Sequence, residues 1–292
     1  MTNEPVKILL QTTIPATVDD WSIARFSQLG ALLSEQRSAD GAPLCAVTMR
    51  DRDPPGRPDS LLSAIDETDF DQLWLFAVDT GDGLTSEDCA AISRFRRSGR
   101  GLLVTRDHMD LGSSVCTLGG IGDAHYFHST HQDPDASRHV IDDPFTNYIS
   151  WPNFHSGANG DFQEIEVVGT PHPVLADPKS PTGAIRLLPA HPHEGGIGAP
   201  QGEDARVIAA GRSKVTGTSF ALAVAFEPGQ QGGPGIAQST FHHFADYNWD
   251  TAAGSPSFVD EPPGDGGGRH QAGLADTHRY VLNLAAWLSH RR

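Results

Sequence analysis

A carboxylate and an imidazole stand side by side just after a short apolar run. Residues 102–104 read Leu-Leu-Val, which favours a strand buried on both faces of a parallel sheet. Arg106, Asp107 and His108 follow this run within a few positions. Because ligands of open α/β sheets bind beyond the carboxyl ends of the strands, we expect chemistry at these three side chains.

A second group of polar residues belongs to the segment 235–250, which is predicted to be a strand running into a polar cluster. This group contains His242 and His243, and Asp246 is the nearest acid. Two neighbouring strand ends can bring such groups within hydrogen-bond range of one small ligand. Adjacent side chains point apart in a strand, so His242 and His243 face one site together only where the chain has already turned.

We predict His108, His243 and Asp107 as the catalytic residues. A histidine held by a carboxylate acts as a general base near neutral pH. Two or three imidazoles with an aspartate also suit Zn²⁺, Mn²⁺ or Fe²⁺, so His108 and His243 are equally candidate metal ligands, with Asp107 orienting or ligating. The alternative interpretation is that Asp107 only caps the following turn and that one histidine of the later pair is structural.

Four further side chains are predicted to contact the substrate. Arg106 would bind a substrate anion or stabilise developing charge. The others are His125, His242 and Asp246.

Histidines also gather outside the two strand ends. Residues 121–161 are polar and aromatic, and we expect a long loop or small lid that closes over the cleft. The histidine spacing within residues 125–131 is a weak metal motif, so a solvated lid with aromatic anchors is the favoured interpretation. Residues 191–194, His-Pro-His-Glu, are predicted to form an exposed turn, with projection into the cleft as the alternative.

The order of predicted elements indicates the fold. Strand-like and helical patterns alternate four times along residues 6–104, which is typical of βαβ units and a parallel sheet. Later strand-like runs follow one another through turns and predict an antiparallel extension. These runs are residues 162–168, 184–188, 206–210 and 218–226. We therefore predict an α/β, flavodoxin-like three-layer sandwich with a mostly parallel sheet, as a single domain over residues 1–292.

Local signals predict several boundaries. Asp19 and Asp20 are expected to open the first helix, and Thr85 with Asp88 is expected to form a capping box for a later one. Residues 252–272 are rich in Gly, Pro and Asp, which predicts a surface excursion.

Composition argues against several classes of partner. The formal net charge is −16, and such an acidic surface repels phosphate backbones and anionic lipid, so neither nucleic acid nor a membrane is expected. No stretch approaches the roughly 20 apolar residues of a membrane span, and the N-terminus does not resemble a signal peptide. Three widely separated cysteines fit a reducing cytoplasm. Without a P-loop or GxGxxG motif, no nucleotide cofactor is expected.

The order of elements and four segments resemble the class I glutamine amidotransferase-like superfamily, and more narrowly its ThuA-like (trehalose-utilisation-like) branch. The segments are residues 99–112, 116–122, 168–177 and 239–250. In glutaminase members the turn after the fourth strand carries a nucleophilic cysteine, which is replaced here by Arg106, Asp107 and His108. This argues against glutamine hydrolysis through a thioester. The ThuA-like branch also lacks this cysteine.

Two functional hypotheses remain open. The first is a hydrolase-like enzyme acting on a small polar molecule, which the resemblance implies to be a sugar derivative, with or without a divalent metal. The second is a non-catalytic ligand-binding or sensing domain on a scaffold that has lost its nucleophile. A homo-oligomer is compatible with both.

Overall fold

The computed structural model describes residues 4–140 and 148–289. Within these residues the main sheet has eight strands in the order β2-β1-β3-β4-β10-β9-β8-β6, and its first five are parallel. The remaining three run antiparallel to their neighbours, which confirms the predicted extension. The strands are β1 (Val6–Thr12), β2 (Cys45–Arg50), β3 (Gln72–Phe76), β4 (Gly101–Thr105), β6 (Glu166–Val167), β8 (Ala205–Arg212), β9 (Ser219–Phe226) and β10 (Gly235–Gln238).

Two of the predicted extension strands form a separate small sheet. β5 (Phe162–Glu164) pairs only with β7 (Leu187–Pro189), in antiparallel register. The Asp276 carboxylate accepts hydrogen bonds from the backbone N–H groups of Arg186 and Leu187. This contact ties the start of β7 to a helix rather than to the main sheet.

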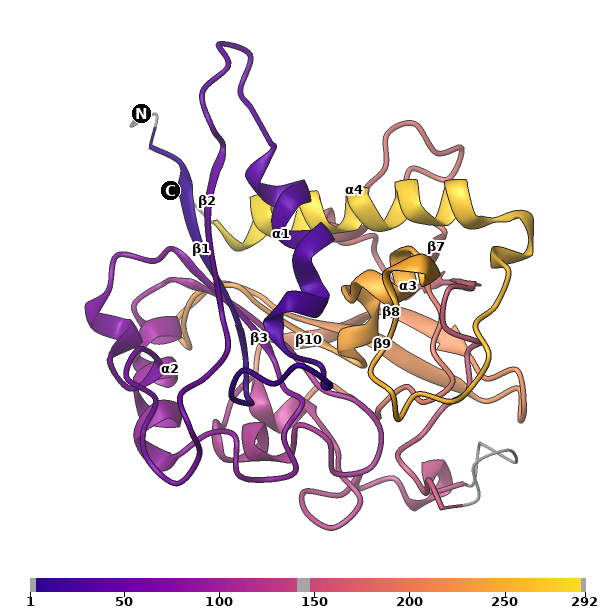
Figure 1. The fold of residues 1–292 in the computed structure, drawn as a ribbon, viewed down its shortest axis with the longest axis horizontal. Helices are drawn as coiled ribbons and strands as arrows, with labels where there is room; N and C mark the ends of the chain where they lie inside the picture. Colours follow the sequence, from indigo (N-terminus) through magenta and orange to yellow (C-terminus); the bar gives the residue numbers. More distant parts are fainter. Residues whose placement is uncertain (1–3, 141–147, 290–292) are drawn as a thin grey trace.

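Helices cover both faces of the main sheet, which completes the three layers (Figure 1). Along β1, Ile8 and Leu10 pack in one apolar core, while Leu9 between them packs in the other, as the period of two in a strand requires. The first core contains α1 (Ser27–Ser34) and α4 (His270–Leu288), and the second contains α2 (Ser86–Arg97). A fourth helix is α3 (Asp246–Trp249).

The predicted helix boundaries are confirmed at α2 and wrong at α1. Thr85 and Asp88 form the predicted capping box. The first helix begins at Ile23, as a 3₁₀ turn, rather than at Asp19. The Asp19 carboxylate instead accepts hydrogen bonds from the backbone N–H and hydroxyl of Ser257, so it holds the 252–272 excursion against the body of the protein.

Most connections contain short 3₁₀ turns. They are η1 (Ile23–Phe26), η2 (Leu62–Glu67), η3 (Ser113–Thr117), η4 (Gly122–Ala124), η5 (Ala136–Arg138), η6 (Pro173–Leu175), η7 (Phe241–His243), η8 (Thr251–Ala253) and η9 (Gly266–Gly268). The predicted polar lid at 121–161 is in part a core segment, because His125, Tyr126 and Phe127 are buried. Residues 141–147 of that prediction lie outside the described residues. No described helix has the length and apolar character needed to cross a membrane.

One buried carboxylate fixes the loop after β2, and we predict that replacing it destabilises the fold. Asp59 is fully buried and accepts hydrogen bonds from the Arg50 guanidinium and from the backbone N–H groups of Asp53, Leu61 and Leu62. Burial raises the pKa of Asp59, but these donors outweigh it and lower the pKa to about 2.

Because this folded-state pKa is below the unfolded value of about 4, the stabilisation is present above that pH and lost as pH falls toward the folded pKa. Asp59→Asn should lower the free energy of unfolding at neutral pH by about 2 kcal/mol, measured by urea denaturation. The difference from wild type should shrink between about pH 4 and pH 2. A difference that does not change over this range would contradict the assignment.

Candidate functional site

Parallel pairing of β4 with β10 brings the two polar strand ends together. Residues 102–105 pair with residues 235–238, and the two chains stay in contact beyond the sheet. The backbone N–H of Phe241 donates to the Arg106 carbonyl oxygen, and the Thr240 hydroxyl donates to Asp107 Oδ1 at 2.9 Å. The turn η7 then directs His242 toward Asp107, with 3.8 Å between His242 Nε2 and Asp107 Oδ2.

A third side chain reaches this point from the loop after β7. His191 Nε2 lies 3.5 Å from Asp107 Oδ1, and the His191 ring stacks on the His242 ring with 3.5 Å between centroids. All three side chains are buried. One ligand atom from each of Asp107, His191 and His242 lies within 4.8 Å of the others.

Two asparagines determine which ring nitrogens carry protons. The Asn248 amide nitrogen donates to the Ala190 carbonyl and to Asn159 Oδ1, which fixes the orientation of both amides. Asn248 Oδ1 then accepts from His242 Nδ1 at 3.0 Å, and Asn159 Oδ1 accepts from His191 Nδ1 at 2.9 Å. Each imidazole therefore keeps its proton on Nδ1 and turns an unprotonated Nε2 toward Asp107 when the ring is neutral.

Burial keeps both rings neutral. It lowers the pKa of His191 to about 4, and it lowers the pKa of His242 well below the usual range. Burial alone would raise the pKa of Asp107, but the pKa lies well below its ordinary value, and the His108 ring and the Thr240 hydroxyl donate hydrogen bonds to the carboxylate. Near neutral pH a carboxylate and two nitrogen lone pairs thus converge, and His191 Nε2 has no hydrogen-bond partner.

Three acceptor atoms converge here, and no proton lies between them. Such an arrangement is suited to binding a cation. Two imidazoles and one carboxylate are a ligand set for Zn²⁺, Mn²⁺ or Fe²⁺, and the asparagines supply the outer hydrogen bonds that orient metal-binding histidines. Among the described residues, this is the group of histidine, cysteine and acidic side chains that could hold a metal. The residues present therefore fit a divalent metal.

The three side chains form part of the wall of a cavity of about 420 Å³. His108 also lines it, and its Nδ1 donates to Asp107 Oδ2 at 3.0 Å. The His108 ring packs edge-on against His193, whose Nε2 lies 2.8 Å from Glu261 Oε1. This contact lowers the pKa of Glu261 to about 2. Glu261 belongs to the predicted 252–272 surface excursion, which therefore forms one wall of the cavity.

His243 lies outside this cavity. Its ring is fully buried, with Nδ1 2.6 Å from the Gln238 amide nitrogen and Nε2 3.4 Å from Glu194 Oε2. The Glu194 carboxylate also accepts from Ser239 at 2.8 Å, from Ser156 and from Gln163. The structure thus separates the two adjacent histidines, since His242 faces Asp107 and His243 faces Glu194.

Of the four predicted substrate contacts, His242 lines the cavity, and the other three lie away from it. Arg106 is fully buried, its guanidinium carbon is 4.4 Å from the centre of the Phe127 ring, and burial lowers its pKa to about 9. His125 is buried nearby, and burial holds its pKa well below the usual range. Asp246 accepts hydrogen bonds from the backbone N–H groups of Ser27 and Gln28, so it caps the start of α1.

Sequence reasoning did not place His191 beside Asp107 and His242. Residues 191–194 were predicted to form an exposed turn, and that prediction is wrong because His191, His193 and Glu194 are all buried. This turn can be buried because its polar side chains have hydrogen-bond partners. Glu194 accepts from Ser156 and Ser239, and His191 Nδ1 donates to Asn159. The two closely spaced histidines, His191 and His193, were the signal in the sequence. Their projection into the cleft was the alternative interpretation of this segment.

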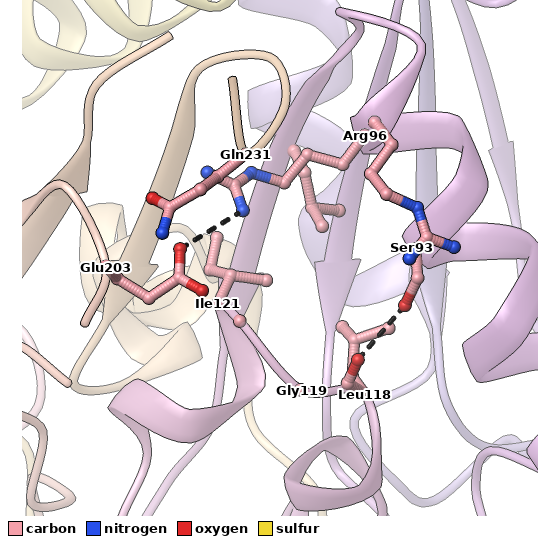
Figure 2. A pocket seen from close by; sticks show the side chains of 10 residues that line it. Ser93, Arg96, Leu118, Gly119, Ile121, Glu203 and Gln231 are labelled. Carbon is pink, nitrogen blue, oxygen red and sulfur yellow. Dashed lines mark hydrogen bonds and ion pairs between the residues drawn. The ribbon is translucent and has the colours of Figure 1, made fainter. Parts of the chain in front are cut away.

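A second cavity of about 230 Å³ lies at the other end of β4, beside Leu102 and the end of α2. Figure 2 shows Arg96 facing Glu203 across it, with 3.9 Å between Arg96 Nη1 and Glu203 Oε2. Ser93 donates to the carbonyl oxygen of Leu118 at 3.0 Å. The charges of Arg96 and Glu203 are opposite and balance each other. This cavity therefore lacks the group of converging acceptors that the first cavity has.

Replacing Asn248 tests the role assigned to the asparagines. Asn248→Ala should weaken Zn²⁺ binding by about 10- to 100-fold, because His242 loses the acceptor that holds its Nδ1 proton. Isothermal titration of metal-free protein would measure this. Asn283→Ala is the matched control, since that amide also donates two hydrogen bonds, in its case to the Val174 and Ala176 carbonyls, but does not contact the site. Equal losses of affinity in the two variants would contradict the role of Asn248.

The chain matches no protein-family model and no curated protein. Among solved structures, the N-terminal domain of mmIFT52 has a TM-score of 0.52 at 10% identity, covering 94% of this chain and 96% of that one. A protein described as ThuA-like from Bacteroides uniformis has a TM-score of 0.47 at 13% identity, covering 97% and 94%. The glutaminase domain of Trypanosoma brucei CTPS has a TM-score of 0.46 at 14% identity, covering 96% and 94%.

The likeness is one of fold. ThuA-like and glutaminase structures are among the matches. Identities this low assign neither an activity nor a residue role to this chain, because one fold hosts many functions. The site must therefore be interpreted from its own geometry.

Proposed function

We propose that this protein is a metal-assisted hydrolase that acts on a small polar molecule. Asp107, His191 and His242 would hold one Zn²⁺, Mn²⁺ or Fe²⁺ ion at the inner end of the 420 Å³ cavity. The observation that carries the proposal is the convergence of an ionised carboxylate with two unprotonated imidazole nitrogens, in tautomers fixed by Asn159 and Asn248. Without a cation, burying these three converging acceptors costs folding free energy.

A bound divalent cation would supply Lewis acidity toward a water molecule and a substrate oxygen. His108 is the residue of this chain that would move the proton. Its Nδ1 is held by Asp107, which leaves Nε2 as its free basic atom, and the half-buried ring lines the cavity. His108 would thus act as general base and then as general acid toward the leaving group.

Turnover that depends on the metal tests this proposal. The full chain would be stripped with a chelator, reloaded with one equivalent of each metal, and assayed with 4-nitrophenyl acetate and with a panel of small amides and glycosides. We expect turnover only in reloaded wild-type protein, with loss in His242→Ala and a strong decrease with retained metal in His108→Ala. Turnover that survives chelation would contradict metal assistance.

The same assay addresses the second hypothesis, a ligand-binding domain without catalysis. Stoichiometric metal uptake and ligand binding without turnover on any member of the panel would favour it. A reducing compartment stays our proposal for the location of the protein, in keeping with its three cysteines, which form no disulfide among the described residues.

A further inference from the structure

The cavity is lined by four carboxylates and four histidines. Asp20, Asp107, Asp260 and Glu261 line it, and no lysine or arginine is among the described residues of its wall. Asp107 is buried at the inner end beside the two histidines, whereas Asp260 is exposed at the outer end. An anionic ligand would therefore meet negative charge on its way in.

Two of these carboxylates have oxygens free for a ligand. Asp20 Oδ1 accepts only from the Trp21 backbone N–H, and Asp260 makes no side-chain hydrogen bond or ion pair with a described residue. Glu261 differs, because its Oε1 is bound to His193. Asp20 and Asp260 are thus the two acidic groups at the mouth that can bind an incoming cation.

Aromatic side chains stand beside these carboxylates. Trp21 and Phe241 contribute atoms to the wall but are buried in the core, whereas Phe258 at the mouth is 57% exposed although it is large and apolar. Exposed aromatic faces bind cations and the carbon faces of rings. At the inner end, His191 Nε2 is buried and has no hydrogen-bond partner, so the cavity ends at a polar atom that is open to a metal or to a ligand group.

We propose that the substrate is a small ring compound carrying an ammonium group, such as an amino sugar, with its positive charge bound by Asp20 and Asp260 and its carbon face on Phe258. This inference rests on the proposed function for the location of the reaction. It adds the charge and shape of the substrate, which the metal ligands alone do not determine.

Three pyranoses that differ in charge test this selection. Binding of glucosamine, glucose and glucuronate to the full chain would be measured by isothermal titration at low ionic strength. We expect glucosamine to bind about tenfold more tightly than glucose, and glucuronate to bind most weakly, with the preference decreasing as salt is added. Asp20→Asn with Asp260→Asn should bring the glucosamine-to-glucose ratio close to one.

Glu35→Gln is the control, since it removes an exposed carboxylate on the far end of α1, and it should leave the ratio unchanged. Equal binding of glucosamine and glucuronate, an unchanged ratio in the double variant, or no binding of glucosamine at about 50 mM would overturn the inference. Repeating the series in His242→Ala separates the two claims. The charge preference should persist there while metal binding is lost, so either claim can fail alone.

Discussion

Asp107→Asn is expected to weaken Zn²⁺ binding by at least about 100-fold while the fold is retained. The substitution keeps the size of the side chain and one acceptor for the Thr240 hydroxyl, but it removes the negative charge that balances the cation. It also replaces one oxygen by an amide nitrogen, which cannot ligate. Competition with a fluorescent zinc chelator would measure the affinity, and circular dichroism would check the fold.

Asp79→Asn is a suitable control for this experiment. Asp79 is also a buried carboxylate beyond a strand end, but its oxygens accept from Ser114 and from the backbone of Gly81, outside the cavity. This variant should keep the zinc affinity of wild type even if it is less stable. Wild-type affinity in Asp107→Asn would contradict the ligand assignment.

The second large effect is expected on stability, at Glu194. Glu194→Ala should lower the free energy of unfolding by about 4 kcal/mol, because the hydroxyls of Ser156 and Ser239 and the Gln163 amide lose a buried acceptor together. His243 loses its nearby carboxylate in the same step. Urea denaturation at neutral pH would give the value.

Glu166→Ala provides the comparison, since this residue lies on the short strand β6 with its side chain exposed. It should change stability by less than about 0.5 kcal/mol. A loss below about 1 kcal/mol in Glu194→Ala would show that the Glu194–His243 network is not the structural unit described here.

The parallel half of the sheet could be predicted because its signals are local. Each strand is an apolar run of about five residues, and Asp107 and His242 follow two of those runs directly. The rule that ligands bind beyond strand ends then located one half of the site. Sequence alone could not order β4 next to β10, which is what brings the two residues into contact.

The remaining half of the site depends on long-range contacts. Whether His242 or His243 faces Asp107 is decided by the turn η7, and two adjacent histidines carry no sign of that choice. His191 looked exposed because a proline follows it, yet its partner Asn159 is 32 positions away in the chain. Arg106 was predicted to bind a substrate anion because it follows a strand end, but here its guanidinium is buried against the Phe127 ring.

X-ray absorption at the zinc edge, on protein loaded with one equivalent of Zn²⁺, tests the central claim most directly. The account predicts two imidazole nitrogens and one or more oxygens at about 2.0–2.2 Å, with the imidazole signal lost in His191→Ala. A sulfur ligand at about 2.3 Å, or a shell of oxygens alone, would show that the metal binds elsewhere and would contradict the site described here.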